Sequence, residues 1–142
     1  MNSMTGRVFI DTNILLYAEF EDGSNKHRVT QKLLLQDLLG AEVFISTQVF
    51  NEFYVQAMRK GKTADDIEAV LQQYITKFNV LPLDLGLVKD GWRIKRQYQF
   101  SYWDSLVVAA SLSSACKVLY TEDLQDGQII DDTLHIINPM LR

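Results

Sequence analysis

The sequence predicts an α/β fold with a mostly parallel central sheet that helices cover on both faces. Short apolar runs rich in β-branched and aromatic residues alternate along the chain with segments of helical periodicity. Parallel neighbouring strands need a crossover, which is usually a helix, so this alternation favours a parallel sheet. One helical segment, residues 103–115, has almost no polar side, as expected of a helix buried against the sheet.

About five strands are predicted, each from a short run of β-branched and aromatic side chains. In chain order these runs are residues 8–10, 43–45, 78–81, 118–120 and 134–137. The segments between them repeat apolar residues at three- and four-residue spacing, as amphipathic helices do. Gly40 ends the first such segment, and a Thr63-x-x-Asp66 capping box opens the third. The helices are predicted at residues 29–39, 49–58, 67–78, 85–98 and 103–115.

Length and composition favour one domain over residues 1–142, with a flexible start at residues 1–6. The 142 residues are close to the size of one domain, and 47% are hydrophobic, enough for a core without disulfides. A net charge of −4 disfavours broad coating of nucleic acid. One cysteine, Cys116, rules out an internal disulfide, and no apolar run approaches the roughly 20 residues of a membrane helix. We therefore expect a soluble, cytoplasmic protein.

Four acids from separate segments are expected at one edge of the predicted sheet. Asp11 directly follows the first strand, and Asp123 lies three residues beyond the fourth strand. Asp104 opens the apolar helix, and Glu52 lies in the early turns of the helix after the second strand. In open α/β sheets, strand ends and helix starts share the edge where ligands bind.

Each acid also has a purely structural interpretation. Asp11 is placed to cap the next helix, and Ser101-x-x-Asp104 matches a capping box. Glu52 shares a polar helix face with Gln48, which is typical of a solvated surface. Together, however, several carboxylates at one edge would repel one another and raise their pKa values. A divalent cation relieves that repulsion, and oxygen ligands with two histidines and one cysteine in the chain suit Mg²⁺ or Mn²⁺ rather than zinc.

Four short motifs contain these acids. They are Phe9-Ile10-Asp11-Thr12-Asn13-Ile14-Leu15, Asn51-Glu52-Phe53, Tyr102-Trp103-Asp104-Ser105-Leu106 and Tyr120-Thr121-Glu122-Asp123-Leu124. In this order they resemble the acidic motifs of PIN domains, and most closely those of the short bacterial VapC-like toxins of toxin–antitoxin pairs. The resemblance runs from the first strand to Ile137-Asn138-Pro139, which is essentially the whole chain.

The resemblance implies a three-layer α/β/α sandwich and a Mg²⁺- or Mn²⁺-dependent ribonuclease. Its acidic quartet, which is both catalytic and metal-binding, corresponds here to Asp11, Glu52, Asp104 and Asp123. Supporting residues of the family's motifs correspond to Thr12, Asn13, Thr121 and Asp126. Glu122 competes with Asp123 for the last acidic position, although the Thr-x-Asp spacing favours Asp123.

Our hypothesis for the chemistry is hydrolysis of an RNA phosphodiester bond without a protein nucleophile. Asp11, Asp104 and Asp123 would hold one or two metal ions, and Glu52 would be an outer ligand or would position water. The metal would lower the pKa of a bound water, polarise the phosphate and stabilise charge on the leaving oxygen.

Two basic strips and a run of aromatic residues are candidate RNA contacts. The basic strips consist of Arg59, Lys60 and Lys62, and of Lys89, Arg93, Lys95 and Arg96. A solvated surface explains both strips at least as well as contacts with phosphates. The aromatic residues are Tyr98, Phe100, Tyr102 and Trp103. They can stack on bases of single-stranded RNA, although packing in the core or a dimer interface is the commoner use of aromatic residues.

The resemblance also implies a homodimer and a small antitoxin protein that covers the active groove. Apolar stripes on the helices at 49–58 and 67–78 would mark an interface if they exceed what the core can absorb. No association with a membrane is expected.

Two other functions stay open. A Mg²⁺-dependent phosphotransfer or phosphatase domain also places acids at strand ends. However, the phosphatase pattern needs a second Asp where this chain has Asn13, and Lys117 precedes the strand that it should follow in a receiver domain. A non-catalytic module that binds RNA or protein would use the acids only as helix caps.

Overall fold

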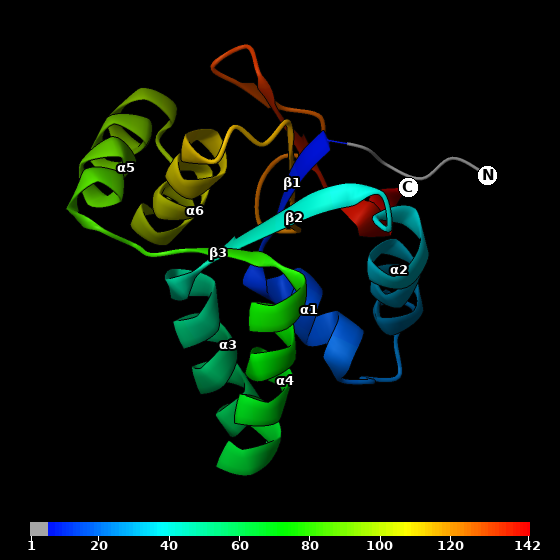
Figure 1. The fold of residues 1–142 in the computed structure, drawn as a ribbon. Helices are drawn as coiled ribbons and strands as arrows, with labels where there is room; N and C mark the ends of the chain where they lie inside the picture. Colours follow the sequence, from blue (N-terminus) through cyan, green and yellow to red (C-terminus); the bar gives the residue numbers. More distant parts are fainter. Residues whose placement is uncertain (1–5) are drawn as a thin grey trace.

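The computed structural model describes residues 6–142, which form one six-stranded sheet with helices on both sides (Figure 1). The strand order is β3-β2-β1-β4-β6-β5. All neighbouring strands are parallel except β5 and β6, which are antiparallel. The predicted α/β fold with a mostly parallel sheet is therefore confirmed. The flexible segment expected at residues 1–6 lies, apart from Gly6, outside the described residues.

A strand forms at each of the five predicted apolar runs, although the third begins at Asn79 rather than at residue 78, and one further strand is present. The strands are β1 (Gly6–Ile10), β2 (Ala41–Ser46), β3 (Asn79–Leu81), β4 (Val118–Tyr120), β5 (Ile129–Ile130) and β6 (Leu134–Ile137). The prediction of about five strands missed β5, because two residues are too few to show an alternating pattern. β5 exists through its pairing with β6, in which Ile130 lies opposite Leu134.

The helices follow the predicted periodic segments with two differences, an additional helix directly after Asp11 and a different course for the helix predicted at 29–39. The helices are α1 (Thr12–Glu19), α2 (Lys26–Lys32), α3 (Thr47–Arg59), α4 (Ala64–Lys77), α5 (Leu85–Tyr98) and α6 (Tyr102–Ser113). The helix predicted at 29–39 begins earlier, as α2, and continues as a π-helix, Leu33–Asp37. The predicted capping box does open α4, since Thr63 Oγ1 accepts a hydrogen bond from the Asp66 N–H at 3.2 Å. A short 3₁₀ helix, Pro139–Leu141, follows β6.

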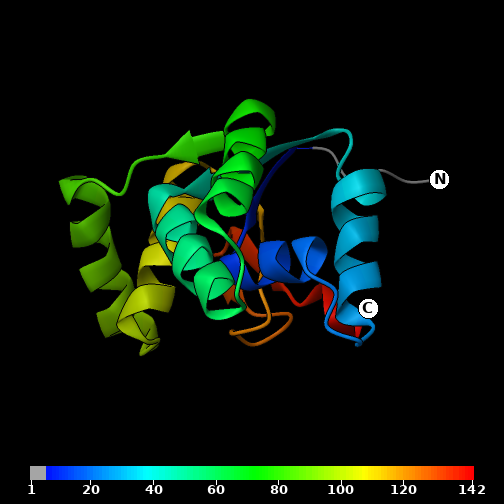
Figure 2. The same cartoon turned by 90° about the horizontal axis from the view of Figure 1, so that it is seen from below.

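Helices α5 and α6 lie on one side of the sheet, and α1 to α4 lie on the other (Figures 1 and 2). This arrangement follows from right-handed crossovers, because the chain runs from β1 through β2 to β3 in one direction and then returns across the sheet to β4. Residues 105–111 of α6 are all buried, as predicted for the apolar helix. Gly91 lets α5 approach α6 closely, since a Cβ there would lie 2.6 Å from Leu106 Cδ2.

The hydrophobic core surrounds the central strands. Val8, Phe9 and Ile10 of β1 and Leu119 of β4 are fully buried. The packed core therefore holds β1 and β4 in place up to their carboxyl ends at the edge of the sheet. Within residues 6–142, no helix is long and apolar enough to cross a membrane.

Candidate active site

Asp11 lies where β1 ends and α1 begins, beside the end of β4. Its N–H donates to the Tyr120 carbonyl at 3.0 Å, which continues the pairing of β1 with β4. Its carboxylate caps α1, because Oδ1 accepts from the Thr12 N–H at 2.7 Å. The other oxygen, Oδ2, accepts from the Thr121 hydroxyl at 2.8 Å. The cap considered from the sequence is present, and the same bonds fix the carboxylate at the carboxyl edge of the sheet.

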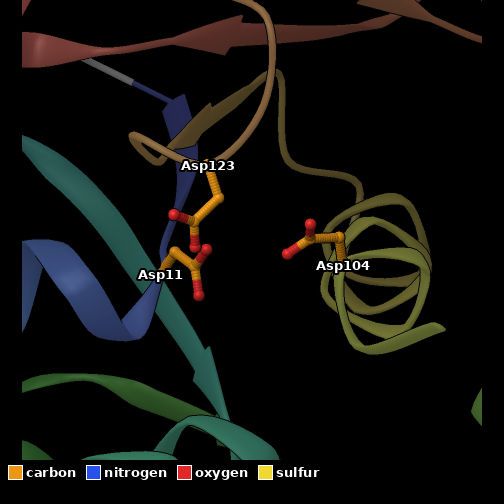
Figure 3. A group of neighbouring side chains, drawn as sticks. All are labelled: Asp11, Asp104 and Asp123. Carbon is orange, nitrogen blue, oxygen red and sulfur yellow. The ribbon is translucent and has the colours of Figure 1, made fainter. Parts of the chain in front are cut away.

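Asp104 and Asp123 bring two further carboxylates to Asp11 (Figure 3). One oxygen from each of the three residues lies within 4.8 Å of the other two. Asp104 is in the first turn of α6, where its N–H donates to the N-cap residue Ser101 at 3.1 Å. Asp123 lies in the loop after β4. Three segments that are far apart in the sequence thus place carboxylates within reach of one cation.

Glu52 is half-buried on α3 and lines the same cavity as the three aspartates. Its Oε1 accepts from the Thr12 hydroxyl at 2.9 Å. Thr12 therefore connects Glu52 to Asp11, whose carboxylate accepts from the Thr12 N–H. This geometry favours a role at the site over the solvated surface that the helix pattern also allowed.

Asn13 and Thr121 link Asp11 to Asp123. Asn13 Nδ2 donates to Asp123 Oδ2 at 2.9 Å and lies 3.4 Å from Asp11 Oδ2. Thr121 Oγ1 accepts from the Asp123 N–H at 3.1 Å while it donates to Asp11. Asn13 and Thr121, proposed from the sequence as supporting residues, each contact two acids of the cluster.

Asp126 and Glu122 face away from the cluster. The Asp126 carboxylate accepts from the Asn138 N–H and from the Arg142 guanidinium, both at 2.8 Å, and these bonds hold the pKa of Asp126 below its usual value. Glu122 pairs with Lys26 at 3.2 Å. The geometry therefore favours Asp123 over Glu122 for the last acidic position, and it does not bring Asp126 to the cluster.

A cavity of about 700 Å³ opens over the clustered acids. In addition to the four acids, Thr12 and Asn13, it is lined by Leu16, Gln48, Asn51, Val55, Gln56, Arg59, Leu83, Trp103 and Val107. Within residues 6–142, Arg59 is the one member of the two basic strips at this cavity, and Trp103, 59% exposed, is the one member of the aromatic run. The cavity thus has an acidic rim beside a largely apolar wall.

Gln48 is a residue of this cavity that the sequence analysis did not propose for the site. It is 4% exposed, and its Nε2 donates to the Trp103 carbonyl at 3.1 Å. This bond joins the first turns of α3 and α6, the helices that carry Glu52 and Asp104. Gln48 precedes Glu52 by four residues on the same helix face, and this spacing is the signal that could have identified it.

Burial, more than mutual repulsion, raises the pKa values of the clustered carboxyl groups. Burial raises the pKa of Asp11 from its usual 3.8 to about 7, although hydrogen bonds from Thr121 and Thr12 oppose the change. Burial is also the largest cause of the raised pKa values of Glu52 and Asp104, to which neighbouring carboxylates add. The repulsion expected from the sequence is therefore present but secondary. Ionising all these groups is costly unless a cation compensates their charge.

Solved structures with the same fold include several toxins of toxin–antitoxin systems. The Mycobacterium tuberculosis toxin VapC20, described as cleaving the sarcin–ricin loop, is 16% identical with a TM-score of 0.66, over 79% of this chain and 86% of that one. A toxin–antitoxin complex from Klebsiella pneumoniae is 18% identical with a TM-score of 0.69, over 93% and 97%. VapBC-1 from nontypeable Haemophilus influenzae is 16% identical with a TM-score of 0.67, over 94% and 98%.

Sequence comparison gives the family directly. No curated protein matches the chain. The PIN domain family model matches residues 8–125, a range that holds the acidic quartet and ends just before Asp126. The resemblance inferred from the four acidic motifs is therefore confirmed, and the chain belongs to the PIN domain family.

Proposed function

We propose that this chain is a metal-dependent endoribonuclease that hydrolyses RNA phosphodiester bonds. The observation that carries the proposal is the meeting of Asp11, Asp104 and Asp123, from three separate segments, within 4.8 Å. Membership of the PIN domain family supports it. A structural relative is a toxin that cleaves the sarcin–ricin loop, which also favours RNA as the substrate. We propose further that residues 1–142 act as one nuclease domain, because all six strands share one sheet.

The side chains at the cluster fit Mg²⁺ or Mn²⁺. Within residues 6–142, the oxygen-bearing side chains that line the cavity are carboxylates, amides and the Thr12 hydroxyl, and the lining has neither histidine nor cysteine. Such oxygen ligands suit hard divalent cations. Asp11, Asp104 and Asp123 would hold the ion. A bound cation would supply an activated water at neutral pH and would polarise the scissile phosphate. Glu52, fixed by the Thr12 hydroxyl, faces the same cavity and would orient the attacking water.

Digestion of structured RNAs by the purified protein tests the proposal. We expect cleavage in the presence of Mg²⁺ or Mn²⁺ and none with excess EDTA. Because water rather than the 2′-hydroxyl is the nucleophile, end mapping should find no 2′,3′-cyclic phosphate. Absence of metal-dependent cleavage over a panel of RNAs would contradict the proposal. Stable acyl-phosphate labelling of Asp11 would instead favour the phosphotransfer alternative.

Trp103 is positioned to stack on an unpaired base beside the scissile phosphate. It is 59% exposed, lines the cavity and directly precedes Asp104. Stacking contributes about 1 to 3 kcal/mol per base, so Trp103→Ala should raise the KM for a single-stranded RNA roughly 5- to 150-fold, with a smaller change in kcat. The Gln48 bond to the Trp103 carbonyl does not depend on the ring.

Trp92→Ala is the matched control for Trp103→Ala. Trp92 is 48% exposed on α5 and does not line this cavity. Its removal should leave the KM unchanged. If Trp103→Ala instead alters the oligomeric state while the KM stays constant, packing between subunits is the correct role of the ring.

We also propose that the chain acts as the toxin of a toxin–antitoxin pair in the cytoplasm, as a homodimer that binds a small antitoxin protein. Structural relatives are toxin–antitoxin complexes, which supports an antitoxin partner. Val55 and Met58 of α3 and Ile75 of α4 are 45%, 55% and 50% exposed, so these helices carry more apolar surface than the core covers. Such exposed apolar side chains favour a protein interface on α3 and α4.

A further inference from the structure

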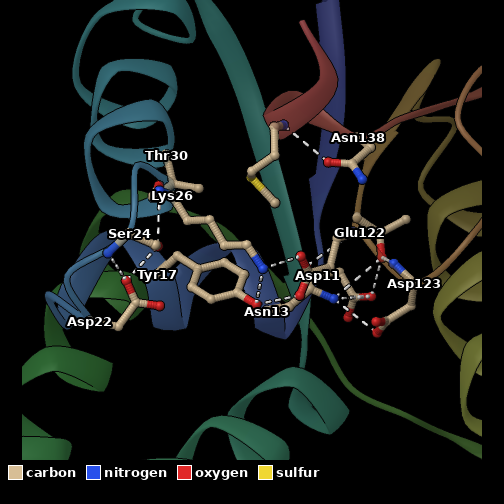
Figure 4. A network of polar contacts seen from close by, with 12 residues as sticks. Asp11, Asn13, Tyr17, Asp22, Ser24, Lys26, Thr30, Glu122, Asp123 and Asn138 are labelled. Atoms are coloured by element: carbon tan, nitrogen blue, oxygen red, sulfur yellow. Dashed lines mark hydrogen bonds and ion pairs between the residues drawn. The ribbon is translucent and has the colours of Figure 1, made fainter.

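The carboxylate of Glu122 points away from the acidic cluster, although Glu122 directly precedes Asp123. Its Oε1 accepts a hydrogen bond from the Tyr17 hydroxyl, and its Oε2 pairs with Lys26 Nζ at 3.2 Å. Lys26 Nζ also donates to the Tyr17 hydroxyl at 3.1 Å. Figure 4 shows these three side chains converging on the far side of Asn13 from Asp123.

The loop that carries Asp123 is thus held from two directions. Asn13 Oδ1 accepts from the Glu122 N–H at 3.3 Å, and Asn13 Nδ2 donates to Asp123 Oδ2 at 2.9 Å. Tyr17 and Lys26 hold the Glu122 side chain on the opposite side. Tyr17 lies on α1, the helix that Asp11 caps, and Lys26 begins α2.

We propose that Tyr17 and Lys26 are positioning residues for the metal-binding carboxylate of Asp123. They hold Glu122 outward, so that consecutive acids of one loop face opposite ways and Asp123 is presented to Asp11 and Asp104 before an ion arrives. A ligand that is already in place loses less conformational freedom when it binds, which increases affinity. This inference rests on the proposed metal site, and it adds two residues that do not contact the ion.

The inference predicts a loss of metal affinity in Tyr17→Phe, which keeps the ring and the net charge of the protein. Loss of a residue that bonds directly to a metal ligand typically costs about 10- to 100-fold in affinity. Tyr17 bonds to Glu122, the neighbour of Asp123, so we expect the lower limit, a rise of about 10-fold in the Kd for Mn²⁺. Isothermal titration calorimetry with MnCl₂ and the full-length protein measures this Kd without any RNA. The kcat at saturating Mn²⁺ should change much less than the Kd.

Lys26→Met separates positioning from simple electrostatics. Removing a positive charge near an acidic cluster would by charge alone tighten the binding of a cation. Removing an anchor of Glu122 should weaken it. Weaker Mn²⁺ binding in Lys26→Met therefore supports the inference, and unchanged or tighter binding overturns it.

A second group of the same kind provides the matched control. Asp131 accepts from the Tyr98 hydroxyl and from the Arg93 guanidinium, both at 2.7 Å, and none of these residues lines the cavity of the acidic cluster. Tyr98→Phe removes a comparable hydroxyl at a comparable ion pair. It should lower the melting temperature without changing the Kd for Mn²⁺.

The outcomes are distinct. If Tyr17→Phe and Tyr98→Phe lower the melting temperature alike and both keep the wild-type Kd, the Tyr17 network only stabilises the fold and the inference is wrong. If the wild-type protein itself binds no Mn²⁺, the proposed metal-dependent function fails, independently of any variant.

Discussion

Asp104→Asn is expected to abolish metal-dependent RNA cleavage while the protein stays folded. The change removes the negative charge that faces Asp11 and Asp123 from the start of α6. It keeps the backbone N–H that donates to Ser101, so the helix cap survives. Changing an outer partner of a metal ligand costs about 10- to 100-fold, and loss of a direct ligand should cost more. Initial cleavage rates at saturating Mg²⁺ measure the effect.

Asp66→Asn is the control for Asp104→Asn because Asp66 occupies the equivalent position of the capping box that opens α4. Its N–H donates to Thr63 as that of Asp104 donates to Ser101. Asp66 is exposed and does not line the cavity, so this variant should cleave RNA at the wild-type rate. Full activity of Asp104→Asn, or an equal loss in both variants, would show that Asp104 is a helix cap without a role in the reaction.

Without metal, the free energy of unfolding should fall as the pH rises from about 4 to about 7. The pKa of Asp11 is about 7 in the folded state, far above its usual 3.8, so between these values the folded state keeps a proton that the unfolded state has released. Stability rises with pH only where the unfolded state binds more protons, so in this window it falls. The contribution of Asp11 is complete below about pH 4 and lost above about pH 7, and it amounts to roughly 4 kcal/mol.

A divalent cation should offset much of this loss, because it stabilises the ionised Asp11 carboxylate of the folded state. At a concentration of 100 times Kd, a ligand of the folded state adds about 2.7 kcal/mol. Urea unfolding at about pH 5 and about pH 8, with EDTA or with Mn²⁺, measures both effects. The decline between these pH values should be much smaller in Asp11→Asn. An identical decline in that variant would assign the titration to another group, and no stabilisation by Mn²⁺ would contradict the metal site.

The sequence was sufficient to predict the strands and helices whose residue pattern is local. The five apolar runs and the periodic helices carry their own signals, and the alternation of the two types predicts the parallel sheet. β5 and the start of α2 have no such signal. Ile129–Ile130 becomes a strand because β6 lies beside it, and Lys26–Lys32 is a largely polar helix with Thr30 as its buried residue. Tertiary contacts decide both elements.

The candidate site was predictable to the level of a sheet edge but not to the level of individual contacts. Fold topology alone places Asp11, Asp104 and Asp123 at the same edge of the sheet. Which way an acid in the loop after β4 points depends on partners from distant segments, such as Asn13 for Asp123. The spacing of Gln48 from Glu52 places it on the same helix face, but it does not predict which group Gln48 contacts. Its hydrogen bond to the Trp103 carbonyl joins two helices and is seen only in the structure.

Both outermost strands of the sheet are short, and this limits how the molecule can assemble. β3 has three residues and is followed directly by Pro82, which has no N–H to donate, while β5 has two residues. Neither edge strand offers enough free backbone N–H and C=O groups for a strand of a second molecule to pair with it and extend the sheet. Strand addition is therefore a poor route to self-association or aggregation, and we expect contacts between copies of this chain to use other surfaces, such as those of the helices.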